Sequence, residues 1–133
     1  MRTVVIGSGS WGTALAQVLQ DNHQEVLVYG VAEAEVNDIN ENHKNSKYFK
    51  DVELNPELKA TTDIQCVKGA DIVLLAVPTI AIDPICHQIN DLLDKKSLLL
   101  VNKNDEKLLI SISEAMTEKY GLEKAFFYIN AYR

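Results

Sequence analysis

Cysteine and basic residues are scarce in this chain of 133 residues. Its two cysteines, Cys66 and Cys86, form no Cys-x-x-Cys pair, and no histidine lies at metal-ligand spacing from them. A disulfide scaffold or a metal site therefore has little support, and free buried thiols are the favoured interpretation. The 13 basic side chains against 19 acidic ones give a net charge of −6. This charge opposes the phosphate attraction on which nucleic-acid binding depends, so nucleic acid is not an expected partner.

Long hydrophobic runs are also missing. The longest apolar stretch, residues 72–82, contains Pro78 and is shorter than the roughly 18 residues that a membrane span requires. The apolar run near the N-terminus is too short for a secretory signal. We therefore expect no membrane span and a cytoplasmic location. The Gly-Lys-Ser/Thr of a Walker loop and any Ser-His-Asp pattern are absent as well, which argues against phosphoryl transfer and triad hydrolysis.

Strand and helix patterns alternate along the whole chain. Apolar runs predict six buried strands at residues 3–6, 25–29, 58–61, 71–77, 97–101 and 125–129. Helical periodicity predicts helices at residues 11–22, 32–42, 61–69, 79–93 and 107–120, with a polar loop at residues 43–56. Strands that are apolar throughout and separated by helices are typical of a parallel sheet covered on both faces. The sequence predicts one α/β domain, residues 1–133, with a doubly wound parallel sheet.

A glycine motif lies between the first strand and the first helix. Residues 7–12 read Gly-Ser-Gly-Ser-Trp-Gly and fit G-x-G-x-x-G in the strand-to-helix context that this motif requires. Gly7 allows the tight turn, Gly9 lets the backbone approach a pyrophosphate, and Gly12 allows close packing of helix on strand. The free N–H groups at the start of the helix favour phosphates. The motif predicts a Rossmann dinucleotide site; the alternative is a glycine turn that only packs.

The end of the second strand bears on the choice between NAD and NADP. The dinucleotide unit places an acid about 20 residues past the motif to bind the adenosine ribose. Here the strand is followed by Gly30, Val31 and Ala32, and the nearest acid is Glu33, which is one or two residues late and equally suits the first turn of a helix. No arginine is there to meet a 2′-phosphate, which favours NAD over NADP.

Three further segments are expected at the same edge of the sheet, because ligands of open parallel sheets bind beyond the carboxyl ends of the strands. Val77 and Pro78 follow the fourth strand and either cover the ribose or nicotinamide side or simply stop the strand. Lys103 follows the fifth strand, where a lone cation would attract a phosphorylated or carbonyl substrate. Residues 44–50 form a basic cluster, which belongs either to the site or to a solvated surface.

The sequence resembles the cofactor-binding domain of the bacterial-type NAD(P)-dependent glycerol-3-phosphate dehydrogenases over nearly its whole length. The resemblance rests on residues 7–16, with their Gly-Ser-Trp-Gly-Thr-Ala string, and on residues 45–49, 58–63 and 70–78. It implies reversible hydride transfer between NAD(P)H and dihydroxyacetone phosphate, giving sn-glycerol 3-phosphate. It also implies that Ser10 and Trp11 contact the cofactor, that Tyr48 lies near it, and that Lys103 touches both cofactor and substrate. Motif and resemblance together give a candidate cofactor site of Gly7, Gly9, Ser10, Trp11, Gly12, Tyr48, Val77, Pro78 and Lys103.

The sequence departs from the family pattern at several places. The family's basic residue after the second strand falls at Val31 and Ala32 and is missing, and Asn104 replaces the glycine that usually follows the lysine. The Ser-Gly-Pro segment that helps to hold the substrate phosphate would fall near residues 129–133 and is absent. The helical domain with the catalytic lysine would begin beyond Arg133.

No catalytic residue is therefore expected within residues 1–133. We expect the chain to bind NAD or NADP, but to reduce dihydroxyacetone phosphate poorly or not at all unless a second domain supplies the rest of the substrate site. The alternative is a non-catalytic dinucleotide-binding or redox-sensing module. Self-association through an apolar surface, giving a homo-oligomer, is a further possibility.

Overall fold

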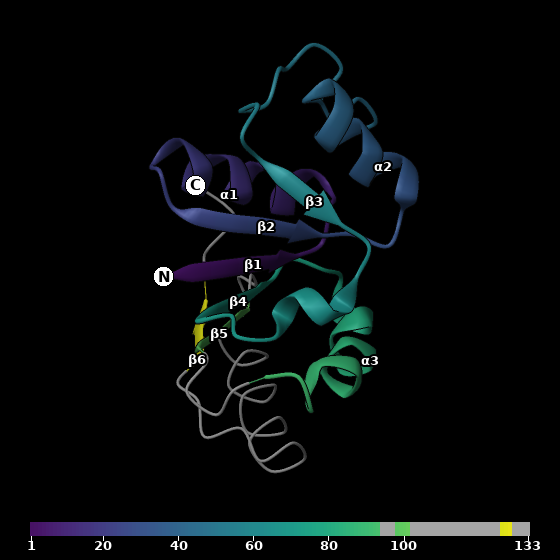
Figure 1. Cartoon of the computed structure of the whole chain (residues 1–133). Helices are drawn as coiled ribbons and strands as arrows, with labels where there is room; N and C mark the ends of the chain where they lie inside the picture. Colours follow the sequence, from purple (N-terminus) through teal and green to yellow (C-terminus); the bar gives the residue numbers. More distant parts are fainter. Residues whose placement is uncertain (94–97, 102–125, 129–133) are drawn as a thin grey trace.

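The computed structural model describes residues 1–93, 98–101 and 126–128 (Figure 1). Its helices and strands alternate as the sequence predicts. In chain order they are β1 (Arg2–Ile6), α1 (Ser10–Asp21), β2 (Glu25–Tyr29), α2 (Glu33–Asn37), the π-helix η1 (Asp38–Asn42), β3 (Lys59–Thr61), the 3-10 helix η2 (Ile64–Val67), β4 (Ile72–Leu75), α3 (Thr79–Ile89), β5 (Leu98–Val101) and β6 (Phe126–Tyr128).

The strands form one six-stranded sheet in the order β3-β2-β1-β4-β5-β6. Every neighbouring pair is parallel. This order, in which β1 has β2 on one side and β4 on the other, is that of the doubly wound dinucleotide-binding folds. The prediction of a six-stranded parallel sheet is confirmed.

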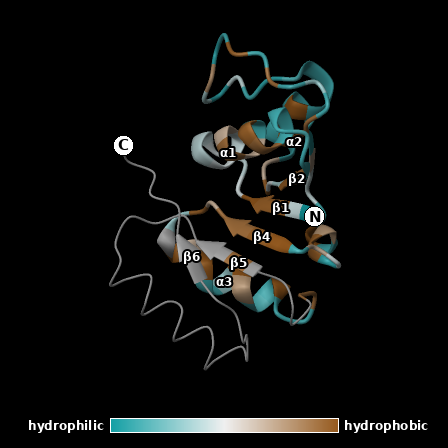
Figure 2. Ribbon diagram, turned by 90° about the vertical axis from the view of Figure 1, so that its left-hand side faces the viewer, coloured by the Kyte–Doolittle hydropathy of each residue, from teal (hydrophilic) through white to brown (hydrophobic). Residues whose placement is uncertain are grey.

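Two hydrophobic cores lie on the two faces of the sheet, because successive side chains of a strand point to opposite faces. Val4 and Ile6 of β1 belong to the core that η2 and α3 cover. Val5, between them, belongs to the core that α1, α2 and η1 cover. Figure 2 shows the central strands as a hydrophobic layer, with hydrophilic residues on the outer surfaces of the helices. Helices cover both faces, as predicted.

Several elements are shorter or more irregular than predicted. The helix expected at residues 32–42 widens into the π-helix η1 and ends at His43, which has a φ of 56°. The helix expected at residues 61–69 is a single 3-10 turn, capped by the Asp63 carboxylate, which accepts a hydrogen bond from the Gln65 N–H at 2.9 Å. Helix α3 ends at Ile89 rather than at residue 93. The helix expected at residues 107–120 lies outside the described residues.

Candidate functional site

A cavity of about 450 Å³ lies beyond the carboxyl ends of β1, β2 and β4. It is lined by three chain segments that follow these strands, residues 6–11, 29–31 and 76–78, together with Glu35, Tyr48, Ala81 and Ile85. Because β1 is the strand at which the sheet order changes direction, the cavity occupies the topological switch point. Its volume is in the range of about 300–1,000 Å³ that small-molecule sites occupy.

The fold itself requires glycine at two of the three motif positions. Gly7 has a φ of 123°, and a Cβ there would lie 2.2 Å from the carbonyl oxygen of Ala76. A Cβ on Gly12 would lie 2.0 Å from the carbonyl oxygen of Gly7. Both distances are far below van der Waals contact. The tight turn at Gly7 and the close packing of α1 on β1 at Gly12 are therefore present.

Gly9 is different, because nothing in the fold requires glycine there. Its φ of −75° and ψ of −170° are open to any residue, and the nearest atom to a Cβ there would be the Tyr48 hydroxyl at 4.0 Å. Gly9 lines the cavity and is the N-cap of α1, whose first turn has no side-chain cap. The first-turn N–H groups of α1 therefore have no side-chain cap, and the glycine at the N-cap adds no Cβ to the cavity wall beside them. A phosphate group fits this arrangement.

A buried amide joins the glycine loop to the polar loop that follows η1. Asn45 is 1 % exposed, and its Nδ2 donates to the Ser8 carbonyl at 2.8 Å and to the Thr13 hydroxyl at 3.0 Å. The N–H groups of Tyr48 and Phe49 donate in turn to the Asn45 carbonyl, at 3.1 and 2.9 Å. These bonds hold the Tyr48 loop against the glycine loop and position Tyr48 on the cavity wall. Asn45 lies within residues 45–49 of the family resemblance, but the sequence gives this residue no role.

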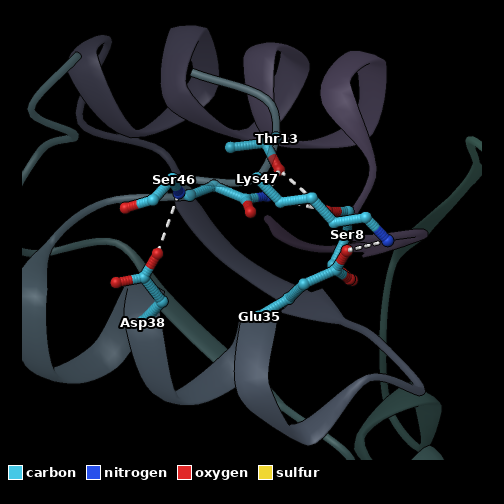
Figure 3. A network of polar contacts seen from close by, with 7 residues as sticks. Ser8, Thr13, Glu35, Asp38, Ser46 and Lys47 are labelled. Atoms are coloured by element: carbon cyan, nitrogen blue, oxygen red, sulfur yellow. Dashed lines mark hydrogen bonds and ion pairs between the residues drawn. The ribbon is translucent and has the colours of Figure 1, made fainter. Parts of the chain in front are cut away.

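A second polar cluster lies where β2 meets the cavity (Figure 3). The Ser8 hydroxyl donates to Glu35 Oε2 at 2.7 Å, and Lys47 Nζ lies 3.8 Å from Glu35 Oε1. A Cβ on Gly30 would lie 2.3 Å from Ser8 Oγ, so glycine at the end of β2 makes room for this contact. The acid that the sequence indicates, Glu33, is exposed and does not line the cavity. Sequence reasoning missed both Ser8 and Glu35.

Burial and hydrogen bonds shift the pKa of three groups near the site. Burial, and then the negative charges of Cys66 and Asp63, raise the pKa of Tyr29 above its usual 10.0. Burial raises the pKa of the Cys66 thiol too. Neither Cys66 nor Cys86 forms a disulfide, as expected; Cys86 is buried, whereas Cys66 is only half-buried. The Ser46 N–H, which donates to Asp38 Oδ2 at 2.8 Å, lowers the pKa of Asp38 together with the Asn42 amide. Figure 3 shows the Asp38 contact, which fastens the start of the Tyr48 loop to η1.

The cavity brings together most of the candidate site. Seven of the nine predicted residues line it: Gly7, Gly9, Ser10, Trp11, Tyr48, Val77 and Pro78. Gly12 lies behind the loop, under the Gly7 carbonyl. Lys103 lies outside the described residues. Among the residues that are described, no cluster of His, Cys, Asp or Glu could hold a metal ion, and no helix is long and apolar enough to span a membrane.

A parallel sheet in this order, with a glycine loop at its switch point, defines a dinucleotide-binding domain of the Rossmann class. The model of a more specific family, the NAD-dependent glycerol-3-phosphate dehydrogenase N-terminus, matches residues 2–127. The chain belongs to this family, the N-terminal, NAD-binding domain of glycerol-3-phosphate dehydrogenases.

Individual relatives agree with this assignment. Glycerol-3-phosphate dehydrogenase [NAD(P)+] of Macrococcus caseolyticus is 45% identical over 127 residues, which are 93% of this chain and 38% of the relative. The structure of glycerol-3-phosphate dehydrogenase from Saccharomyces cerevisiae superposes with a TM-score of 0.81 at 25% identity, covering 95% of this chain and 41% of that one. The enzyme from Coxiella burnetii gives 0.79 at 25% identity, covering 96% and 39%. The chain therefore spans about two fifths of the length of these relatives.

Proposed function

We propose that residues 1–133 are the cofactor-binding part of a glycerol-3-phosphate dehydrogenase and bind NAD or NADP in the cavity at the switch point. The observation that carries this proposal is Gly9. The fold would accept a side chain there, so the open space in front of the α1 N-terminus is explained by a ligand that needs the backbone. The site also suits the negative charge of a pyrophosphate, because uncapped N–H groups and the dipole of a helix N-terminus attract anions.

The lining residues divide according to the strand that they follow. The backbone of residues 8–11 would hold the pyrophosphate, and the end of β2, with Gly30 and Val31, would face the adenosine half. Val77 and Pro78, after β4, would face the nicotinamide half. A bound nicotinamide supplies or accepts the hydride. The protein's part is to place that ring beside the substrate and to keep water away.

The proton that accompanies carbonyl reduction needs a donor within hydrogen-bond reach of the substrate oxygen. Among the described residues that line the cavity, Glu35 is the one formally charged side chain, and Ser8 already binds it. We therefore assign the general acid to the part of the enzyme that corresponds to the remaining length of the relatives. The exposed apolar side chain of Ile80, 87 % accessible, suits a surface that further protein covers.

Two measurements test this proposal on the chain of 133 residues. Isothermal titration calorimetry with NADH and NADPH should show saturable one-to-one binding of at least one of them. Loss of reduced-nicotinamide absorbance in the presence of dihydroxyacetone phosphate should be slow or absent. Absence of binding by a folded chain would overturn the proposal. Binding combined with rapid turnover would contradict the assignment of the general acid to another part of the enzyme.

A non-catalytic dinucleotide-binding or redox-sensing module is the second candidate. The observation in its favour is that the described lining of the cavity contains no lysine or histidine that could give a proton to a carbonyl substrate. Adding the corresponding C-terminal part of the Macrococcus caseolyticus relative to the chain distinguishes the two. Recovery of dihydroxyacetone phosphate reduction supports the dehydrogenase, and an inactive chimera that still binds cofactor supports the module.

A further inference from the structure

The charge of the cavity is unusual for a site that holds a phosphorylated ligand. Its described lining contains Glu35 and no lysine or arginine. At the end of β2 the lining residues are Tyr29, Gly30 and Val31, so the backbone there is followed by an apolar side chain and not by a cation. A ligand group that lies beside this part of the wall therefore meets the Glu35 carboxylate, whose ion-pair partner Lys47 lies 3.8 Å away and is not part of the lining.

Glu35 is held in place, and one of its oxygens still has room to accept. Its side chain is 12 % exposed, and Oε2 accepts the Ser8 hydroxyl at 2.7 Å. Lys47 Nζ lies 3.8 Å from Oε1, beyond hydrogen-bond distance, and the lysine is 69 % exposed. An ionised carboxylate can accept about four hydrogen bonds in total. Oε1 is therefore a fixed acceptor on the β2 side of the cavity, where neutral hydroxyl donors would be bound well.

The neighbouring acid of the same helix provides a natural comparison. Glu33 and Glu35 are two residues apart on α2, and at about 3.6 residues per turn they lie on opposite sides of the helix. Only Glu35 lines the cavity, while Glu33 is exposed. The two residues have the same side chain and the same formal charge, and they differ in whether they face the cavity.

We propose that Glu35 is the specificity-determining residue of the cofactor site, and that it binds the adenosine ribose diol of NAD and disfavours the 2′-phosphate of NADP. This inference rests on the proposed function. In dinucleotide-binding folds an acid near this place in the chain accepts from the ribose hydroxyls. In NADP the 2′-hydroxyl, a hydrogen-bond donor, is replaced by a negatively charged phosphate. NADP would therefore lose the hydrogen bond to Glu35 and place its phosphate beside a charge of the same sign. The Ser8 hydroxyl fixes the carboxylate by a hydrogen bond, and Lys47 forms an exposed ion pair with it.

The test compares Glu35→Gln with Glu33→Gln in the full chain, by calorimetric titration with NADH, NADPH, ADP-ribose and 2′-phospho-ADP-ribose. The wild type should bind NADH and ADP-ribose at least tenfold more tightly than their 2′-phosphorylated counterparts. Glu35→Gln should narrow this ratio at least fivefold for both pairs, by weakening the unphosphorylated ligand and strengthening the phosphorylated one. Glu33→Gln should leave the ratio unchanged within twofold. Thermal unfolding of each variant shows that the comparison is made between folded proteins.

Four results would overturn the inference. One is a wild type that binds NADPH as tightly as NADH, as it would if Lys47 took up the 2′-phosphate; this result needs no variant and stands even if Glu35→Gln does not fold. Another is an equal change of the ratio in both variants, which would show a general charge effect. The third is a wild type that binds none of the four ligands, which would overturn the proposed function as well. Binding with an unchanged ratio in Glu35→Gln would overturn the role of Glu35 alone.

Discussion

Replacing Gly9 by alanine separates the needs of the fold from the needs of a ligand. The added Cβ meets no atom closer than the Tyr48 hydroxyl at 4.0 Å, and the backbone angles suit alanine. Alanine reduces the conformational freedom of the unfolded chain, which stabilises the folded protein by about 0.4–1 kcal/mol. Alanine is also a poorer N-cap than glycine, which destabilises the folded protein by roughly 0.5–1 kcal/mol. These effects nearly offset each other. The melting temperature of Gly9→Ala should stay within about 4 °C of the wild type.

Cofactor binding by Gly9→Ala should fall sharply. On the proposed function, a Cβ at this N-cap position would occupy part of the space that a pyrophosphate needs in order to reach the backbone N–H groups of α1. A hydrogen bond to a charged group contributes about 1.5–3 kcal/mol, so loss of one such bond corresponds to roughly 10- to 100-fold weaker binding. Calorimetric titration with NADH, paired with thermal unfolding of the same sample, measures both quantities. A stable variant whose affinity stays within twofold of wild type would refute the assignment of this space to a phosphate.

Two further predictions concern stability. Gly12→Ala should lower the free energy of unfolding, measured by urea titration, by about 2 kcal/mol. The new Cβ would lie 2.0 Å from the Gly7 carbonyl oxygen, and such overpacking costs up to about 3 kcal/mol, while the gain in helix propensity is about 1 kcal/mol. An unchanged urea midpoint would contradict the close packing. The hydrogen bond from the Ser46 N–H lowers the pKa of Asp38 in the folded protein. The Asp38 carboxylate therefore stabilises the folded protein at any pH above its pKa in the unfolded chain, about 4. This contribution is lost as the pH falls through the pKa of the folded state. The stability advantage of wild type over Asp38→Asn should therefore be constant at neutral pH and shrink as the pH falls below about 4; an advantage independent of pH would contradict it.

Most strands were predictable because they contain a short run of apolar residues that no helix period fits; β3, which reads Lys-Ala-Thr, is the exception. Val4, Val5 and Ile6 are all buried, as a central parallel strand requires. The ends of elements were less predictable. Asp71 was expected to open β4, but its carboxylate accepts a hydrogen bond from the Arg2 N–H at 2.8 Å and the strand begins at Ile72. That contact joins residues far apart in the sequence, so local pattern contains no signal for it.

The residues of the candidate site also differ in whether the sequence predicts them. Spacing alone identified Gly7, Gly9 and Gly12, because their roles depend on the local backbone. The sequence could not indicate Glu35 rather than Glu33, because the side of α2 that faces the cavity depends on the direction in which α2 follows β2. Gly30 packs against Ser8 at this point and brings the end of β2 close to the glycine loop. Residues that act through long-range contacts require the folded structure to be recognised.

The central claim, that the cavity at the switch point binds a nicotinamide dinucleotide, is tested most directly through Trp11. This residue is the one tryptophan of the sequence and lines the cavity beside Gly9. Reduced nicotinamide absorbs where tryptophan emits, so a dinucleotide bound in the cavity would quench Trp11 by energy transfer. We predict that NADH quenches Trp11 fluorescence saturably, with one-to-one stoichiometry, and that the quenching is reversed by excess ADP-ribose. Fluorescence from a folded chain that does not change saturably with NADH or NADPH would contradict the claim.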